Sequence, residues 1–95
     1  MTINEIKELS SRLSTRIMEV KFVSPTNNHG DQVRIKDVHF NETKTINWDY
    51  RFNSALQVAI NYLCNVVGIE IQSIAYNDHK DIYYIVTPFD AKRIK

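Results

Sequence analysis

The sequence is poor in the residues that usually mark special structural classes. It has one cysteine, two glycines and two prolines among 95 residues. The lone Cys64 cannot form an intramolecular disulfide, which excludes the disulfide-stapled class of small domains. So few glycines and prolines exclude collagen-like and Pro/Gly-rich low-complexity chains. No apolar run is long enough for a membrane helix and no stretch resembles a signal peptide, so we expect a cytoplasmic protein without a membrane partner.

The chain also lacks an excess of charge of either sign. Twelve basic and 11 acidic residues give a formal charge of +1. This balance excludes proteins that coat nucleic acid by charge alone, and strongly acidic DNA mimics, although a local basic face remains compatible with it. With 43% hydrophobic residues, the composition is that of a globular chain, and residues 1–95 predict one domain. A homodimer interface would add stability to so small a core.

Catalytic motifs are missing as well. The sequence contains no Walker loop, G-x-S-x-G, H-E-x-x-H or C-x-x-C motif. His29, His39 and His79 are scattered, and a metal site formed by His29 and His79 with Asp31 or Asp78 competes with the simpler interpretation of solvated loop residues. We therefore predict a protein that is not an enzyme and holds no cofactor or metal. An enzyme with an unrecognised site is the third interpretation.

The first half of the chain predicts a helix followed by a three-stranded antiparallel meander. Apolar residues at spacings of three and four follow a Thr2-x-x-Glu5 capping box and predict a helix over Ile3–Ile17. Alternating apolar and polar residues predict strands over Met18–Phe22, Gln32–Phe40 and Lys44–Tyr50. The alternation of the second strand slips by one residue, which predicts a β-bulge at Lys36 or Asp37.

The second half predicts a helix packed on the sheet and a C-terminal β-hairpin. A Ser54-x-x-Gln57 capping box begins a helix that ends at Gly68. Cys64 lies on its apolar face, so we expect a buried, unreactive thiol. Two hairpin strands follow, predicted over Ile69–Tyr76 and Asp81–Val86. The polar, basic residues 90–95 are expected to fray. The fold class is therefore α+β, in the order α-β-β-β-α-β-β.

Three predicted loops share one end of this arrangement, because antiparallel strands reverse direction at each turn. They are the loop after the first strand, the exit of the third strand and the hairpin turn. Their candidate binding residues are Thr26, Asn27, His29, Gly30, Tyr50, Arg51, Asn53 and Lys80. Free N–H groups at the helix start would favour a small anion, and polar loops on a scaffold also suit a protein partner. The alternative is that these residues are ordinary turns and caps, with Asp49 or Asp31 pairing with Arg51.

Two further sets of residues carry predictions. Trp48 falls on the apolar parity of the third strand, so we expect it to be buried between the sheet and the second helix. An outward aromatic–basic face would suit single-stranded nucleic acid, and its residues are Lys21, Arg34, Lys36 and Tyr83. The alternative interpretation of this face is a solvated sheet surface.

Residues 21–68 carry a recognisable pattern of turn, basic strand, aromatic stretch and helix. Its elements are Pro25-Thr26-Asn27-Asn28-His29-Gly30, Val33-Arg34-Ile35-Lys36, Trp48-Asp49-Tyr50, Asn53 at the helix start, and Gly68. This pattern resembles a set of short uncharacterised proteins encoded by phages, plasmids and related mobile elements. The resemblance implies a setting and not a mechanism, and small mobile-element proteins without catalytic motifs are often inhibitors of host systems, including antiviral defence. Together with the missing catalytic motifs, it leads us to expect a non-enzymatic binding protein in the host cytoplasm. It would act by occupying a host protein or sequestering a ligand, and no functional residue carries over.

Overall fold

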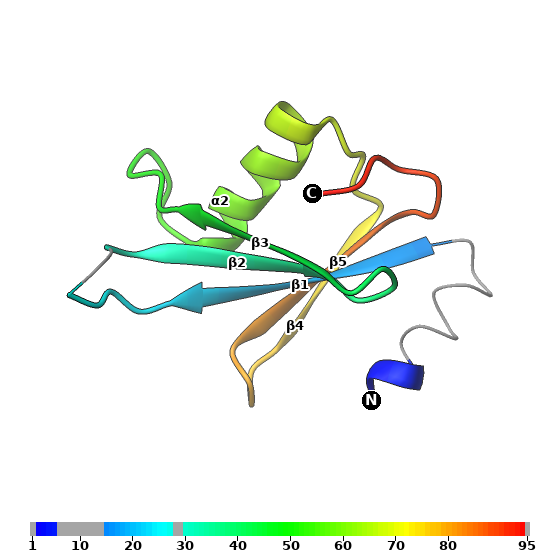
Figure 1. Ribbon diagram of the computed structural model, residues 1–95, viewed down its shortest axis with the longest axis horizontal. Helices are drawn as coiled ribbons and strands as arrows, with labels where there is room; N and C mark the ends of the chain where they lie inside the picture. The colour runs from blue at the N-terminus through cyan, green and yellow to red at the C-terminus, as the bar shows by residue number, and fades with distance from the viewer. Residues whose placement is uncertain (1, 6–14, 28–29, 95) are drawn as a thin grey trace.

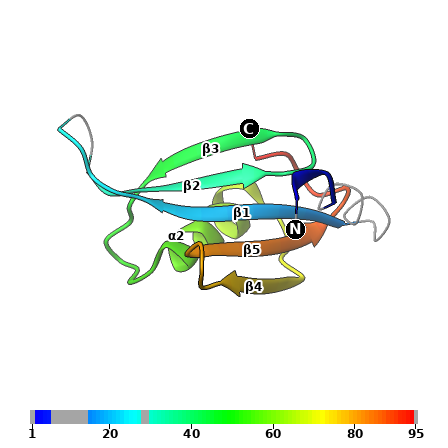
Figure 2. The same ribbon diagram turned by 90° about the horizontal axis from the view of Figure 1, so that it is seen from below.

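The fold is a five-stranded antiparallel sheet with one helix lying across one face (Figures 1 and 2). The computed structural model describes residues 2–5, 15–27 and 30–94. In chain order the elements are β1 (Thr15–Val23), β2 (Gln32–Asp37), β3 (Glu42–Asn47), α2 (Ala55–Asn61), η1 (Tyr62–Val67), β4 (Ser73–Asn77) and β5 (Ile82–Pro88). The predicted α+β class and the predicted order of strands, helix and hairpin are confirmed.

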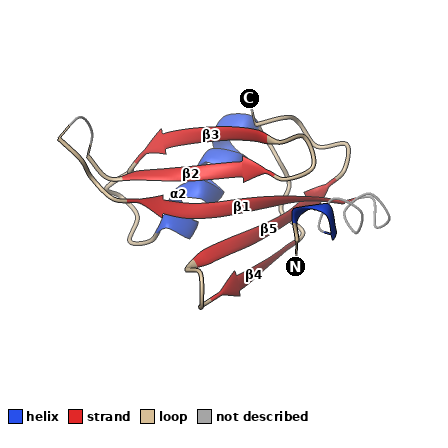
Figure 3. Cartoon of the chain, turned by 60° about the horizontal axis from the view of Figure 1, so that its bottom comes forward, coloured by secondary structure: helices blue, strands red, loops and turns tan. Residues whose placement is uncertain are grey.

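The strands lie in the order β3-β2-β1-β5-β4 (Figure 3). The hairpin β4–β5 does not stand apart from the meander, because β5 pairs with β1 over seven residues. The longest strand, β1, therefore lies at the centre of the sheet. Of the strands that the structure describes, β3 and β4 form the two edges.

The hydrophobic core lies between the sheet and the helix. Alternate residues of β1, β2 and β5 point to the helix, as strand geometry requires. The buried apolar side chains of this layer are Met18, Val20, Val33, Ile35, Val58, Ala59, Leu63, Ile69, Ile85 and Ile94. Burying an aliphatic side chain of this size stabilises the fold by about 1.5–3 kcal/mol.

The predicted first helix is wrong at its C-terminal end. Residues 15–17 belong to β1, where Arg16 pairs with Thr87 and Ile17 with Val86. Pairing with β5, which lies about 70 residues further along the chain, overrides the helical spacing of this segment. Residues 3–5 are helical, and the N–H of Glu5 donates to the hydroxyl of Thr2 at 3.2 Å, as the capping box predicts. Residues 6–14 of the predicted helix lie outside the described residues.

The predicted bulge in the second strand is also wrong. Six consecutive pairs join β1 and β2, and the last of them pairs Met18 with Asp37. The strand ends at Asp37, so the change of parity at Val38 and Phe40 belongs to the hairpin turn. Asn41 closes that turn in a left-handed conformation with a φ of 54°. Asp37 consequently shares the inward face with the apolar residues of β2, which places a carboxylate in the core.

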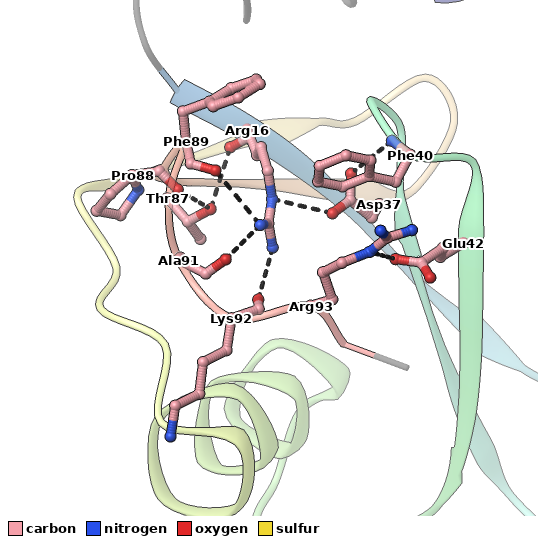
Figure 4. A network of polar contacts seen from close by, with 10 residues as sticks. All are labelled: Arg16, Asp37, Phe40, Glu42, Thr87, Pro88, Phe89, Ala91, Lys92 and Arg93. Carbon is pink, nitrogen blue, oxygen red and sulfur yellow. Dashed lines mark hydrogen bonds and ion pairs between the residues drawn. The ribbon is translucent and has the colours of Figure 1, made fainter.

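The buried carboxylate of Asp37 is neutralised by Arg16 on the neighbouring strand. The Arg16 side chain is 1% exposed and that of Asp37 is 0% exposed, and Nε lies 3.0 Å from Oδ2. Figure 4 shows the Arg16 guanidinium between Asp37 and the C-terminal segment, where it donates to the carbonyls of Ala91 and Lys92. Asp37 Oδ1 also accepts the backbone N–H of Phe40 at 3.2 Å. Each charge is therefore both paired and hydrogen-bonded, which buried charges require.

The C-terminal segment is docked on the domain, so the predicted frayed tail is wrong for residues 90–94. Ile94 is 3% exposed and belongs to the core. Arg93 lies 4.1 Å above the ring of Phe40 and donates to Glu42 at 2.8 Å (Figure 4). The hydrogen bonds from Arg16 hold the backbone just before Ile94. Long-range contacts thus order a segment whose local composition is that of a flexible end.

The second helix begins and ends close to where the sequence predicts, and it packs most of its predicted apolar face against the core, with Cys64 as the exception. Gly68 ends it in a left-handed conformation with a φ of 88°, and its N–H donates to Leu63 across a π-helical turn. Val58, Ala59 and Leu63 are buried against the sheet. Cys64, which follows Leu63, is exposed. The prediction of a buried thiol is therefore wrong.

Candidate functional site

The register of the sheet brings the three predicted loops to one end. Val23 pairs with Gln32, which in turn pairs with Asn47. On the other side of β1, Lys21 pairs with Ile82, the first residue of β5. The loop after β1, the exit of β3 and the β4–β5 turn therefore leave the sheet at the same end, as the sequence predicts.

The candidate residues on these loops do not converge into one site. Thr26, Asn27 and Gly30 are exposed on a loop that extends beyond the end of the sheet (Figure 1). Lys80 is exposed in the β4–β5 turn. That turn joins the two strands on one side of β1, whereas the loop joins β1 to β2 on its other side. Tyr50 is 80% exposed, and His29 lies outside the described residues. Of the eight candidates, Asn53 is the one that lines a described pocket at this end.

Arg51 has its counter-ion within the chain. Its Nε and terminal nitrogen lie 3.0 and 2.6 Å from the two carboxylate oxygens of Asp49, and its guanidinium lies 5.4 Å from the ring centre of Phe52. The side-chain hydrogen bond to Asp49 raises the pKa of Arg51, and the same bond lowers the pKa of Asp49. This is the simpler of the two predicted roles, because the pair does not require an external anion.

The start of α2 is capped by its own side chains. The hydroxyl of Ser54 accepts the N–H of Gln57 at 3.2 Å, and the side chain of Gln57 accepts the N–H of Asn53 at 2.9 Å. The predicted capping box is therefore confirmed. These bonds occupy the N–H of Gln57 at the helix start and that of Asn53 just before it, so both N–H groups already have a partner within the chain.

A pocket lies between this end of the sheet and the start of α2. We call it the aromatic pocket, and it has a volume of about 230 Å³. Its lining residues are Val20, Phe22, Trp48, Asn53, Ser54, Ala55, Asp81 and Tyr83. They come from β1, the exit of β3, the start of the helix and the β4–β5 hairpin. The pocket thus occupies the part of the core face that the helix does not cover.

Aromatic rings form the walls of the aromatic pocket. Trp48 and Phe22 meet edge to face with their centres 5.8 Å apart. Phe22 is 39% exposed, and Trp48 and Tyr83 are half-buried. Trp48 packs against the core, as predicted, but it is not fully enclosed between the sheet and the helix. These rings therefore present apolar surface to an incoming group.

Asp81 supplies a carboxylate at the rim of the aromatic pocket. It adopts a left-handed conformation with a φ of 52°, which is uncommon outside glycine. Its Oδ1 accepts the hydroxyl of Tyr76 at 2.7 Å, and this bond raises the pKa of Tyr76. The ring of Tyr76 also packs on Tyr83, with ring centres 4.6 Å apart. The carboxylate is thereby oriented beside an aromatic wall, where it can accept hydrogen bonds or attract a cation.

The opposite face of the sheet carries the predicted basic residues. A depression of about 250 Å³ lies here, lined by Glu19, Lys21, Arg34, Lys36 and Ile82. Lys21 lies directly opposite Arg34 in the register, and Glu19 lies opposite Lys36. This surface is called the basic face below.

Tyr83 does not belong to the basic face, so that part of the prediction is wrong. It pairs with Val20, and directly paired residues of antiparallel strands share a face of the sheet. Tyr83 therefore points toward the helix and lines the aromatic pocket. The neighbouring Tyr84, which pairs with Glu19, occupies the outer face instead. The sequence shows that these two tyrosines have opposite parity, but not which of them faces the helix.

Within residues 2–5, 15–27 and 30–94, no three His, Cys, Asp or Glu side chains are grouped to hold a metal ion. The helices described in these ranges are too short or too polar to cross a membrane. Comparison of the chain with protein-family models, curated proteins and solved structures gave no match.

Proposed function

We propose that this chain is a non-enzymatic binding protein of a phage or mobile element that inhibits a host system by occupying a host protein. The observation that carries the proposal is the aromatic pocket, where Phe22, Trp48 and Tyr83 line an open part of the core face. Aromatic residues are enriched at protein interfaces and dominate their binding energy. The resemblance of residues 21–68 to phage and plasmid proteins supports the setting.

The exposed ring surface provides the driving force for such binding. Phe22 is 39% exposed, and an aromatic side chain can bury 150–250 Å². At about 25 cal/mol per Å², covering the rest of Phe22 would favour a complex by on the order of 2 kcal/mol. One apolar side chain of a partner, inserted between Phe22 and Tyr83, would achieve this.

The charge of the aromatic pocket favours a protein partner over a small anion. Among the described residues that line it, Asp81 carries a negative charge and none carries a positive one. A carboxylate repels anionic ligands, but it attracts lysine, arginine or an amide donor. Asn53 adds an amide that both donates and accepts hydrogen bonds. The expected partner segment therefore places an apolar side chain next to a basic one.

Affinity capture from host lysate tests this function with a matched pair of variants. Phe22→Ser removes one wall of the aromatic pocket, whereas Phe89→Ser removes a ring of similar exposure, 36%, beside His39 and Phe40. We expect Phe22→Ser to weaken capture of a host protein by at least about tenfold and Phe89→Ser to leave it unchanged. Circular dichroism confirms that both variants fold. A host protein captured equally by both variants would place the binding surface elsewhere.

The basic face supports a second candidate function, binding of single-stranded nucleic acid. Lys21 and Arg34 are directly opposite each other, and like charges in this position destabilise a sheet. A phosphate lying between them would relieve the repulsion. This function predicts a salt-sensitive shift of an oligonucleotide in a native gel, lost in Arg34→Gln and retained in Phe22→Ser. An unshifted oligonucleotide at low salt would exclude it.

A further inference from the structure

The edge strand β4 is unprotected against pairing with another strand. Its sequence, Ser-Ile-Ala-Tyr-Asn, contains no proline and no charged residue, although edge strands usually carry such residues to prevent association. The other edge strand, β3, carries Glu42 and Lys44. On β4, Ile74 is 43% and Tyr76 is 50% exposed. These two side chains face the helix side of the sheet, because they pair with Ile85 and Tyr83.

We propose that β4 pairs with β4 of a second copy of this chain, antiparallel and about a twofold axis through Ala75. In this register Ile74 of one copy lies opposite Tyr76 of the other, on both sides of the axis. Ser73 likewise lies opposite Asn77, and both are polar. Aliphatic–aromatic cross-strand pairs stabilise a sheet. The strand is thus complementary to itself, which a twofold interface requires.

Charges at the ends of the strand agree with the same register. It brings Glu70 of one copy toward Lys80 of the other, once on each side of the axis. Both residues are exposed, and neither forms an ion pair with any residue that the structure describes. A register shifted by two residues would place Ile74 opposite Ile74 of the other copy, or Tyr76 opposite Tyr76 of the other copy. The register centred on Ala75 therefore combines the apolar pairs with opposite charges.

The geometry of the paired sheet follows from the axis. A twofold axis perpendicular to the sheet keeps the helix side of both copies on one face, so the result is a continuous ten-stranded sheet with both aromatic pockets on the same side. Only five residues of each β4 strand pair, which gives an interface near the small end of the known range. We therefore expect a reversible, concentration-dependent dimer. This inference does not depend on the aromatic pocket or its partner.

Disulfide trapping at the axis tests the proposal directly. Ala75→Cys places two thiols opposite each other, and directly paired residues have Cα atoms about 4.5–5.5 Å apart, within the range for a disulfide. Cys64 is exposed, so the experiment uses a Cys64→Ser background. Thr45→Cys is the matched control, because Thr45 is an exposed, outward-facing residue of the other edge strand. Mild oxidation should give a linked dimer from Ala75→Cys and monomer from Thr45→Cys.

Sedimentation velocity provides the second measurement. The native chain should sediment faster as its concentration rises, and Ile74→Lys should remove this dependence, because two lysines would face two tyrosines in an uncharged strand pair. Thr45→Lys on β3 should sediment like the native chain. The proposal is overturned if Ala75→Cys links no more than Thr45→Cys, or if the native chain stays monomeric at every concentration. If β4 instead pairs with a strand of another protein, the native chain by itself would also stay monomeric.

Discussion

Replacing Asp37 by alanine should lower the free energy of unfolding by about 3–5 kcal/mol, because it leaves the Arg16 guanidinium buried without its counter-ion. Arg16 is 1% exposed and cannot reach water without moving the strand or the C-terminal segment. Such a loss is a large fraction of the 5–15 kcal/mol that stabilise most domains. Urea denaturation followed by circular dichroism measures it.

Two further variants serve as controls for this prediction, one at the exposed Asp49–Arg51 pair and one that removes the charge of Arg16. Asp49→Ala also removes a carboxylate from an arginine, but Arg51 is 73% exposed, so water replaces the lost partner and the unfolding midpoint should change little. Adding Arg16→Met to Asp37→Ala should restore part of the lost stability, since the unpaired charge is gone. The carbonyls of Ala91 and Lys92 would still lack their donor. Equal losses in Asp37→Ala and Asp49→Ala would contradict a buried, structural ion pair.

Ile94→Ala should destabilise the protein by about 2–5 kcal/mol, the usual cost of truncating a buried aliphatic residue. Ile94 is 3% exposed and packs in the same core as Leu63 and Ile69. Lys92→Ala is the matched control, because its side chain is exposed while its carbonyl still accepts from Arg16. If both variants unfold at the same urea concentration, the C-terminal segment is frayed, as its composition alone predicts.

Local patterns in the sequence determined the elements that depend on neighbouring residues. The capping boxes at Thr2 and Ser54 and the helix end at Gly68 all appear in the structure. They were predictable because each interaction joins residues three to five positions apart. The common end of the three loops was predictable too, because it depends only on the number of antiparallel reversals. The α+β class follows from the order in which helical and alternating hydrophobic patterns occur along the chain.

The candidate site was predictable only in part. Asn53 lines the aromatic pocket, but Arg51 is paired with Asp49, and the loop after β1 extends beyond the end of the sheet (Figure 1). Phe22 and Tyr83 were missed because they line the same pocket only when β5 lies beside β1. The sequence predicted a hairpin, but it contains no local signal for which strand that hairpin joins. Once the strand order is known, both can be found as aromatic residues that face the same side of the sheet near the end shared by the three loops.

Tertiary structure alone decided which face of each element is covered. The sequence assigned Arg16 to a helix and placed a bulge at Lys36 or Asp37, yet the side chains of Arg16 and Asp37 meet across neighbouring strands in the core. Period-two alternation divides a strand into two faces, and helical spacing defines a stripe, but neither pattern states which other element packs there. Cys64 is exposed, Ile94 is buried and Tyr83 faces the helix for that reason. Contacts between residues far apart in the chain, rather than any local preference, fix those positions.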